Sequence, residues 1–203
     1  MDTLLTINLS RIIMLKQLFK VSLLIAICSF MTACAGNKMN EIPLVKQVDL
    51  PKFMGDWYVI AVIPTAIETQ SFNAIEHYEL NPNGTIATTF TFNKGAFDGP
   101  FKTYQPTGFV RPDSGNALWG MQFIWPIKAE YRIAYLDAQY QRTIIARNAR
   151  DYVWIMARTP QISDDNYLEM TNMVKNLGYD MTKLRKVPQD WSKKTSTTNK
   201  PVY

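Results

Sequence analysis

The sequence predicts an all-β domain, either an antiparallel sandwich or an up-and-down barrel of eight strands, followed by one α-helix packed outside the sheet. Short segments rich in β-branched and aromatic residues recur at nearly regular spacing, with turn residues between them. Strands and helices do not alternate, which excludes a doubly wound fold. The length of 203 residues fits one domain with appendages.

Each strand candidate is bounded by Pro, Gly, Asp or Asn. The clearest hairpin joins the second and third candidates, because Asn83-Gly84 is a strong turn signal between two alternating segments. Residues of even number in the third candidate, such as Phe90 and Phe92, share one face of the strand. The eight predicted strands are 57–63, 72–80, 85–92, 101–110, 117–125, 130–136, 142–147 and 152–158.

One helix follows the strands. Ser163 is a suitable N-cap, Asp164 and Asp165 suit the positive end of the helix dipole, and Gly178 is a typical terminator. A last short strand or turn is predicted at residues 180–184. The apolar stripe of the helix, at spacings of three and four, is Leu168, Met170, Met173, Val174 and Leu177.

The amino terminus has the pattern of an export signal. Two lysines within Met14–Lys20 precede an apolar run, Val21–Met31, which is too short to span a bilayer. Residues 1–33 are therefore predicted to be a signal peptide whose functional start is Met14. Met31–Cys34 resembles a bacterial lipobox, which implies diacylglyceryl and N-acyl modification of Cys34; the alternative is ordinary secretion. Ala35, rather than Asp, implies export to the outer membrane.

Two segments flank the predicted domain. Residues 34–51 are polar and aperiodic, and are predicted to be a lipidated tether. Residues 188–203 are predicted to be a flexible basic tail, either solvated or touching anionic lipid head groups. From Cys34 to Thr182 there are 13 Lys and Arg against 15 Asp and Glu, so the net charge of +5 does not lie on the body. This distribution predicts no nucleic-acid partner.

Catalytic and metal chemistry has little support in the sequence. His77 is the only histidine, so His-rich zinc sites cannot form. Neither G-x-S-x-G, G-x-G-x-x-G nor a P-loop occurs. Cys28 lies in the predicted signal peptide and Cys34 is predicted to be acylated, which leaves no thiol nucleophile. We therefore predict no catalytic residues, no metal and no cofactor.

Aromatic side chains are in excess at alternating strand positions. An eight-stranded barrel is just wide enough for side chains or for one small ligand. The rings therefore either fill a core or line a cup, and alternation alone does not decide between them. The faces in question carry Phe90 and Phe92; Trp119, Met121 and Phe123; Tyr131, Ile133 and Tyr135; and Tyr152, Trp154 and Met156.

Three motifs in order resemble the lipocalins. Gly55-Asp56-Trp57 resembles the G-x-W signature of that family, Tyr135-Leu136-Asp137 lies where its second motif is expected, and Arg158 matches the arginine of its third. The segment 151–165 and the lipobox make the chain similar to bacterial outer-membrane lipocalins of the apolipoprotein D-like group. The resemblance covers about Val45–Val187 and implies an eight-stranded barrel with its helix over residues 52–187.

The resemblance also implies roles for three signature residues. Trp57 would close one end of the barrel with Arg158 packed over its ring, and Gly55 would allow a tight entry into the first strand. These are structural roles. In the second motif the chain departs from the family pattern, because it has Tyr-Leu-Asp instead of Thr-Asp-Tyr.

The function implied is binding, storage or transport of fatty acids, lysophospholipids or similar lipids at the periplasmic face of the outer membrane. The hydroxyls of Tyr78, Tyr131 and Tyr135 would orient a head group. A filled-barrel interaction module, with a homodimer as one form, is the alternative; an enzyme would need a nucleophile or base that the cup lacks. The predicted ligand-binding residues are Tyr78, Phe90, Phe92, Trp119, Met121, Tyr131, Tyr135 and Trp154.

Overall fold

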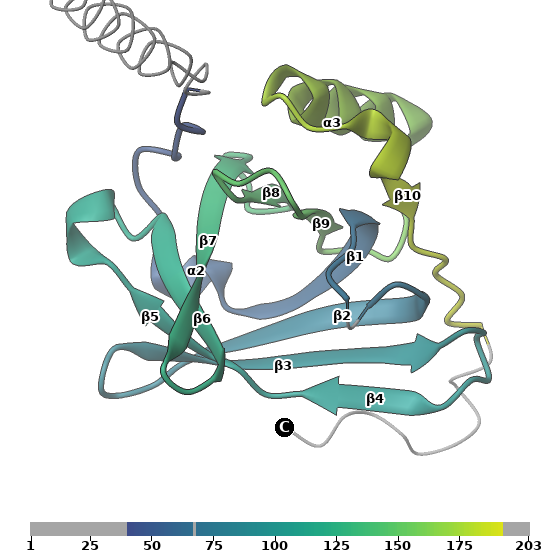
Figure 1. Cartoon of the computed structure of the whole chain (residues 1–203), viewed down its shortest axis with the longest axis horizontal. Helices are drawn as coiled ribbons and strands as arrows, with labels where there is room; N and C mark the ends of the chain where they lie inside the picture. The colour runs from purple at the N-terminus through teal and green to yellow at the C-terminus, as the bar shows by residue number, and fades with distance from the viewer. Residues whose placement is uncertain (1–39, 67, 193–203) are drawn as a thin grey trace, which may run out of the picture. The chain divides into compact units, whose positions relative to one another are not determined.

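One antiparallel sheet closes on itself, because β1 pairs with β2 on one side and with β9 on the other. The computed structural model describes residues 40–66 and 68–192, and the described residues from Glu41 to Ser192 belong to one compact unit (Figure 1). The strands are β1 (Gly55–Ile63), β2 (Ser71–Leu80), β3 (Thr85–Lys94), β4 (Phe101–Tyr104), β5 (Thr107–Val110), β6 (Leu118–Ile124), β7 (Ile127–Leu136), β8 (Arg142–Ala146), β9 (Val153–Ala157) and β10 (Arg185–Lys186).

The closed sheet is the predicted eight-stranded up-and-down barrel rather than a sandwich. β4 and β5 both pair with β3 and share one position around the barrel. The predicted strand 101–110 is divided at Pro106, whose nitrogen has no hydrogen for the ladder. Its carbonyl still accepts from the Thr88 amide at 3.1 Å. The short β10 is an addition that pairs with the edge of β1.

The β2–β3 hairpin turns at the predicted Asn83-Gly84. Gly84 has φ +79°, a conformation that side chains disfavour. The Asn83 side chain accepts hydrogen bonds from the amide and the hydroxyl of Thr85, at 3.1 and 2.7 Å. The local sequence therefore sets the register of this hairpin.

The predicted helix forms outside the barrel. Ser163 caps it by accepting from the Asn166 amide at 3.3 Å, and Gly178 follows its end with φ +86°. Met170 and Val174 are fully buried against the outer face, whereas Leu168 is 60% exposed and does not belong to the packed stripe. The helical elements are α2 (Leu50–Phe53), α3 (Asp164–Asn176) and the 3-10 turns η2 (Pro112–Ser114) and η3 (Met181–Lys183).

Alternation along the strands divides the apolar side chains between two cores. The inner core fills the barrel interior and includes Trp57, Phe92 and Trp119. The outer core lies beneath α3 and includes Ile155 and Met170. A bulge in β1 between Val59 and Ala61 shifts the alternation of that strand between the two cores.

The segment before β1 corrects the predicted tether. Residues 41–49 pack along the barrel rather than hanging free, because Ile42 and Val48 are apolar and fully buried. The amides of Val45 and Val48 donate to the carbonyls of Ile133 and Gly115 at 3.0 and 2.8 Å. Residues 34–39, with Cys34, lie outside the described residues, as does the predicted signal peptide.

The first part of the predicted flexible tail also packs on the barrel. The Gln189 side chain donates to the carbonyls of Val59 and Ala74 at 2.8 and 3.1 Å. The ring of Trp191 meets that of Tyr58 edge to face, with centroids 5.5 Å apart. The Gln189 side chain thus supplies donors to carbonyls on β1 and β2. The prediction of a flexible tail rested on residue composition, which does not show such contacts. Residues 193–203 lie outside the described residues.

In the part of the chain that the structure describes, no helix is both long and apolar enough to cross a bilayer.

Candidate functional site

A cavity of about 430 Å³ lies inside the barrel toward one end. Strands β2, β3, β6, β7 and β9 form its wall, and the β1–β2 loop and the kink between β4 and β5 complete it. The described lining residues are Thr65, Ala66, Glu68, Glu76, Phe90, Tyr104, Gln105, Pro106, Met121, Phe123, Ile124, Ala129, Glu130, Tyr131, Tyr152 and Trp154.

Four of the eight predicted ligand-binding residues line this cavity: Phe90, Met121, Tyr131 and Trp154. Phe92 is also buried inside the barrel, but its ring stacks on Tyr104 and does not line the cavity. The structure therefore brings part of the predicted wall together and assigns the rest to packing.

Tyr78 and Trp119 belong to the floor of the cavity. Both are buried, and their rings meet edge to face with centroids 5.8 Å apart. Trp119 stacks on Tyr131 at 5.0 Å, so a wall residue rests directly on the floor. These two side chains support the cavity from below.

The prediction that Tyr135 lines the cup is wrong. Ile133 faces the inner core, but a bulge in β7 between Ile133 and Tyr135 shifts the alternation by one residue. Tyr135 therefore packs against the outer core beneath α3, and Leu136 takes the inward position.

The far end of the barrel is closed by an aromatic and cationic cluster. Trp57 is completely buried, and its indole Nε1 donates to the Phe53 carbonyl at 2.8 Å. The Arg158 guanidinium lies 3.9 Å from the centre of the Trp57 ring. It also donates to five carbonyl oxygens, those of Lys52, Phe53, Met54, Asp56 and Tyr140.

Gly55 allows the backbone to enter β1 beneath this arginine. Its φ is +91°, and a β-carbon placed there would lie 3.5 Å from an Arg158 nitrogen. A side chain at this position would be strained by the backbone conformation rather than by lack of space. The three signature residues thus lie together at the closed end, away from the cavity.

At the inner end of the cavity, one carboxyl group and two tyrosine hydroxyls form a chain of hydrogen bonds. The Tyr78 hydroxyl donates to Glu76 Oε2 at 2.6 Å and lies 2.7 Å from the Tyr131 hydroxyl. Burial raises the pKa of Glu76 to about 7, and the pKa of both tyrosines is well above 10 for the same reason. At neutral pH the site therefore holds a carboxyl group that is part protonated.

A second buried carboxyl group comes from the β1–β2 loop. Glu68 is 2% exposed, and its Oε2 accepts from the indole nitrogen of Trp154 at 3.0 Å. Its Oε1 accepts from the amide and the hydroxyl of Thr65, at 2.9 and 3.0 Å. Burial raises the pKa of Glu68, and these hydrogen bonds oppose the shift. Glu68 thus fixes both the loop and the orientation of the Trp154 ring.

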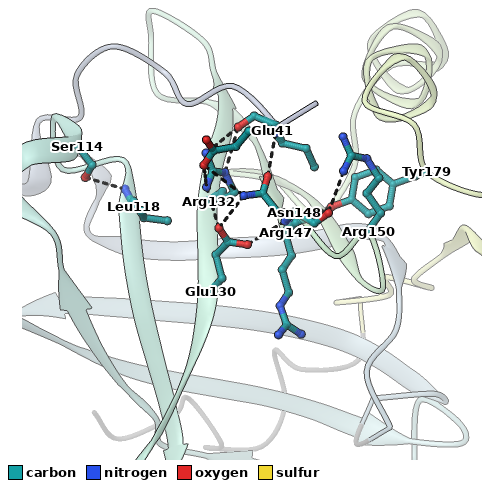
Figure 2. Close-up of polar contacts among 10 residues, drawn as sticks. Glu41, Ser114, Leu118, Glu130, Arg132, Arg147, Asn148, Arg150 and Tyr179 are labelled. Carbon is teal, nitrogen blue, oxygen red and sulfur yellow. Dashed lines mark hydrogen bonds and ion pairs between the residues drawn. The ribbon is translucent and has the colours of Figure 1, made fainter. Parts of the chain in front are cut away.

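Glu130 also lines the cavity, but Arg132 and Asn148 bind its carboxylate. Figure 2 shows it directed toward Arg132 and Asn148. The distance from Arg132 Nη1 to Glu130 Oε1 is 2.7 Å, and the Asn148 amide donates to Oε2 at 2.8 Å. Arg132 is itself 4% exposed. Glu130 therefore forms part of an ion-pair network with the segment before β1, unlike Glu68 and Glu76.

The rim of the cavity is apolar at the β6–β7 hairpin. Ile124 and Ile127 are 71% and 68% exposed, and Trp125 between them is 82% exposed. Phe123 and Ile124 also line the cavity, so the exposed tip and the interior form one continuous apolar surface. An apolar molecule can pass from this rim to the interior without crossing a polar barrier on that side.

Sequence reasoning missed several lining residues. Glu76 was not among the predicted residues, although it shares its strand face with Tyr78, which was predicted to line the cup. Phe123 and Tyr152 were on the predicted inward faces but not among the predicted ligand-binding residues. The sequence did not point to Glu68, because it lies in a loop, where the alternation of a strand does not predict the direction of a side chain.

Neither His77 nor a cluster of metal-ligand residues contributes to this cavity in the part of the chain that the structure describes. His77 points away from it, with Nδ1 2.5 Å from Asp56 Oδ1 on the outer side of the barrel. Among the described residues, no three His, Cys, Asp or Glu side chains are grouped as metal ligands would be.

A family profile described as "Lipocalin-like domain" matches residues 48–189. Temperature-induced lipocalin-1 of Arabidopsis thaliana is 30% identical over 174 residues, covering 80% of this chain and 90% of that protein. Outer membrane lipoprotein Blc of Citrobacter freundii is 27% identical over 182 residues, covering 88% of this chain and 98% of the relative.

Solved structures agree on the fold. Insecticyanin from the tobacco hornworm Manduca sexta superposes with a TM-score of 0.58 at 16% identity, over 76% of this chain and 87% of that one. Apocrustacyanin C2 superposes with a TM-score of 0.57 at 14% identity, over 71% and 81%. At such low identity these matches support the barrel alone.

Proposed function

This chain belongs to the lipocalin family, and we propose on that premise that it binds, stores or transports a lipid, such as a fatty acid or a lysophospholipid, in the cell envelope. The observation that carries the proposal is the cavity of about 430 Å³ with a mostly apolar lining and an apolar rim. Binding pockets for small molecules are commonly of this size and character.

The driving force is transfer of an alkyl chain from water into the barrel. Each buried CH₂ group contributes about 0.8 kcal/mol before the costs of association. The rings of Phe90, Tyr131 and Trp154 are positioned to contact the chain. For a fatty acid or lysophospholipid, the polar head would remain at the rim, where water reaches it.

The volume that the side chains leave inside the barrel favours a ligand-binding cup over the alternative of a filled barrel acting as an interaction module. The rings of Phe53, Trp57 and Trp119 pack densely at the closed end, and the cavity lies beyond them toward the other end. The cavity offers no activated nucleophile among its described lining residues, so the proposed role is binding without catalysis.

The proposed location is the periplasmic face of the outer membrane, with Cys34 acylated and residues before Glu41 as the link to the membrane. The lipobox-like Met31–Cys34 and the similarity to proteins named outer membrane lipoprotein support this. Labelled palmitate should be incorporated by the wild type and by Cys28→Ser, but not by Cys34→Ser. Equal labelling of Cys34→Ser and wild type would refute acylation at this cysteine.

Ligand binding is tested with delipidated protein spanning residues 35–203, which contains the whole compact unit. A lysophospholipid and a fatty acid are titrated below their critical micelle concentrations while tryptophan fluorescence is recorded. We expect a saturable change near one ligand per chain, because Trp154 lines the cavity. No change with either lipid would refute the proposal and favour the interaction module.

A matched pair of variants locates the binding. Ala129 lines the cavity on β7, so Ala129→Trp fills space that the ligand needs and should weaken binding about tenfold or more. Ala138→Trp adds the same ring at an exposed position and should leave the affinity unchanged. Calorimetry measures both, and equal affinities would place the ligand outside the cavity.

A further inference from the structure

The charged side chains that line the cavity are all acidic: Glu68, Glu76 and Glu130. Glu68 and Glu76 are 2% and 7% exposed, and the hydroxyl of Tyr131 lies beside Glu76 through Tyr78. Among the described lining residues there is no lysine, arginine or histidine. The carboxylate or phosphate of a lipid is held most strongly by a cationic side chain, and the described lining offers none.

One acceptor atom in this group is available to a ligand. Glu76 Oε2 is occupied by the Tyr78 hydroxyl, whereas Glu76 Oε1 accepts no hydrogen bond from the described residues. Glu76 lines the cavity. Glu76 Oε1 is therefore open to the cavity, and a cationic donor placed beside it gains a charge-assisted hydrogen bond.

Glu68 contributes charge rather than a free acceptor. Its two oxygens accept three hydrogen bonds, from Thr65 and Trp154. Arg185 donates to the Glu68 main-chain carbonyl and not to the carboxylate. Its positive charge lowers the pKa of Glu68, but burial still raises that pKa overall. The negative charge of Glu68 raises the pKa of Glu76, so Glu68 adds negative potential near Glu76 without competing for the ligand's donor.

Glu130 adds little to this potential. Arg132 and the amide groups of Asn148 neutralise and hydrogen-bond its carboxylate, as Figure 2 shows. The remaining acidity of the cavity comes from Glu76 at its inner end and from Glu68 of the β1–β2 loop.

We propose that the preferred ligand is a cationic amphiphile, a long alkyl chain with a primary ammonium group, and that the ammonium group donates to Glu76 Oε1 at the inner end of the cavity. This proposal rests on the proposed function, because it names the class of lipid that the same cavity takes. The alkyl chain then lies along Phe90, Met121 and Trp154 toward the rim.

The alternatives fit this end of the cavity less well. A carboxylate placed there would face Glu76 and Glu68 and be repelled by both. A fatty acid that enters methyl end first would place a methyl group against Glu76 Oε1 and leave that oxygen without a donor. A neutral hydroxyl could donate to it, but it would not gain from the negative potential.

The protonation of Glu76 gives the proposal a pH signature. Burial raises its pKa to about 7, and the ionisable groups that line the cavity or contact Glu76 are Glu68, Tyr78, Tyr104, Glu130, Tyr131 and Tyr152. An ammonium group binds the ionised form of Glu76, so binding releases a proton below this pKa. Affinity for the amine should therefore rise about tenfold between pH 6 and pH 8. Affinity for a carboxylate should move in the opposite direction.

The test compares three probes with one chain length: decylamine, decanol and decanoate. They are titrated by calorimetry into delipidated protein of residues 35–203 at pH 8, below their critical micelle concentrations. We expect decylamine to bind about tenfold or more tightly than decanol, and decanoate to bind weakest.

Glu76→Gln is the decisive variant, because it keeps the shape and an acceptor for Tyr78 but removes the charge. It should weaken decylamine binding about tenfold, abolish its rise with pH and leave decanol nearly unchanged. Glu79→Gln on the same strand removes an exposed carboxylate and serves as the matched control. Near-ultraviolet circular dichroism checks the packing of both variants, and the wild-type pH series tests the proposal independently of either.

The outcomes distinguish failure of the ammonium proposal from failure of lipid binding in the cavity. Decanol binding as tightly as decylamine, or decanoate binding most tightly, would overturn the ammonium proposal while lipid binding stands. An amine affinity that does not change between pH 6 and pH 8 would also overturn it. No binding of any probe would refute the cavity as a lipid site, and the ammonium proposal with it.

Discussion

The two ends of this barrel are built from similar residues but in opposite ways. At the closed end, Trp57 is enclosed by Phe53 and covered by Arg158, whose guanidinium nitrogens reach five carbonyl oxygens. At the open end, the cavity holds two buried carboxyl groups, and no cationic side chain of the described residues lines it. Aromatic rings occur at both ends, so residue type alone does not separate packing from binding.

The difference shows where the barrel gains and loses stability. Dense aromatic packing with its polar groups hydrogen-bonded stabilises the closed end. An open cavity forgoes contacts, and the buried carboxyl groups of Glu68 and Glu76 lose hydration. Binding sites commonly sacrifice stability in this way, which predicts that substitutions at the two ends change the free energy of unfolding in opposite directions.

The largest effect is expected at the closed end. Trp57→Ala removes a fully buried ring, its hydrogen bond to the Phe53 carbonyl and its contact with Arg158. We expect the free energy of unfolding, measured with urea, to fall by about 4 kcal/mol.

Trp125→Ala is the control at the open rim, where the ring is 82% exposed. It should change the free energy of unfolding by less than about 0.5 kcal/mol. Similar losses for both variants would mean that the two ends contribute equally to stability, and the comparison would fail.

A smaller effect of opposite sign is expected at the open end. Burial raises the pKa of Glu76 from 4.5 to about 7, so between these values the folded protein holds a proton that the unfolded chain has lost. The contribution of this group to stability is therefore greatest below pH 4.5 and is lost as the pH rises to about 7. Gln is uncharged throughout, so Glu76→Gln should stabilise the protein at pH 8 by about 3 kcal/mol, at about 1.4 kcal/mol per unit of pKa shift.

Urea unfolding of wild type and Glu76→Gln across pH 4 to 8 measures this effect. The advantage of the variant should shrink as the pH falls and largely disappear near pH 4.5. Glu79→Gln, which alters an exposed carboxylate, should follow the wild type. A difference between Glu76→Gln and wild type that is constant with pH would show that burial does not hold Glu76 in its protonated form.

Much of the fold could be predicted from local patterns. All eight strands and the helix were predicted close to their observed ends, because turn residues and caps act within a few residues along the chain. Asn83-Gly84 and Ser163 are examples, since their side chains bond to amides two or three residues away. Gly55, Trp57 and Arg158 could be assigned to one cluster only through the family resemblance, because they are separated by most of the barrel in sequence.

The candidate site was predicted less completely. Alternation placed Phe90, Met121, Tyr131 and Trp154 correctly on the cavity wall but failed for Tyr135, because a bulge depends on pairing with the neighbouring strand. Glu68 enters the site through a loop, and loops have no period. The packing of residues 41–49 and 188–192 on the barrel likewise depends on surfaces that form only when distant strands meet.

The sequence by itself determined the strand segments, the turns and the helix, since these follow from interactions between near neighbours in the chain. Only the tertiary structure decided which rings pack at the closed end, which line a cavity at the other, and that Glu68 and Glu76 both line that cavity. The reason is physical: burial and the pKa of a carboxyl group depend on everything within a few ångströms, and most of those neighbours are far away in sequence.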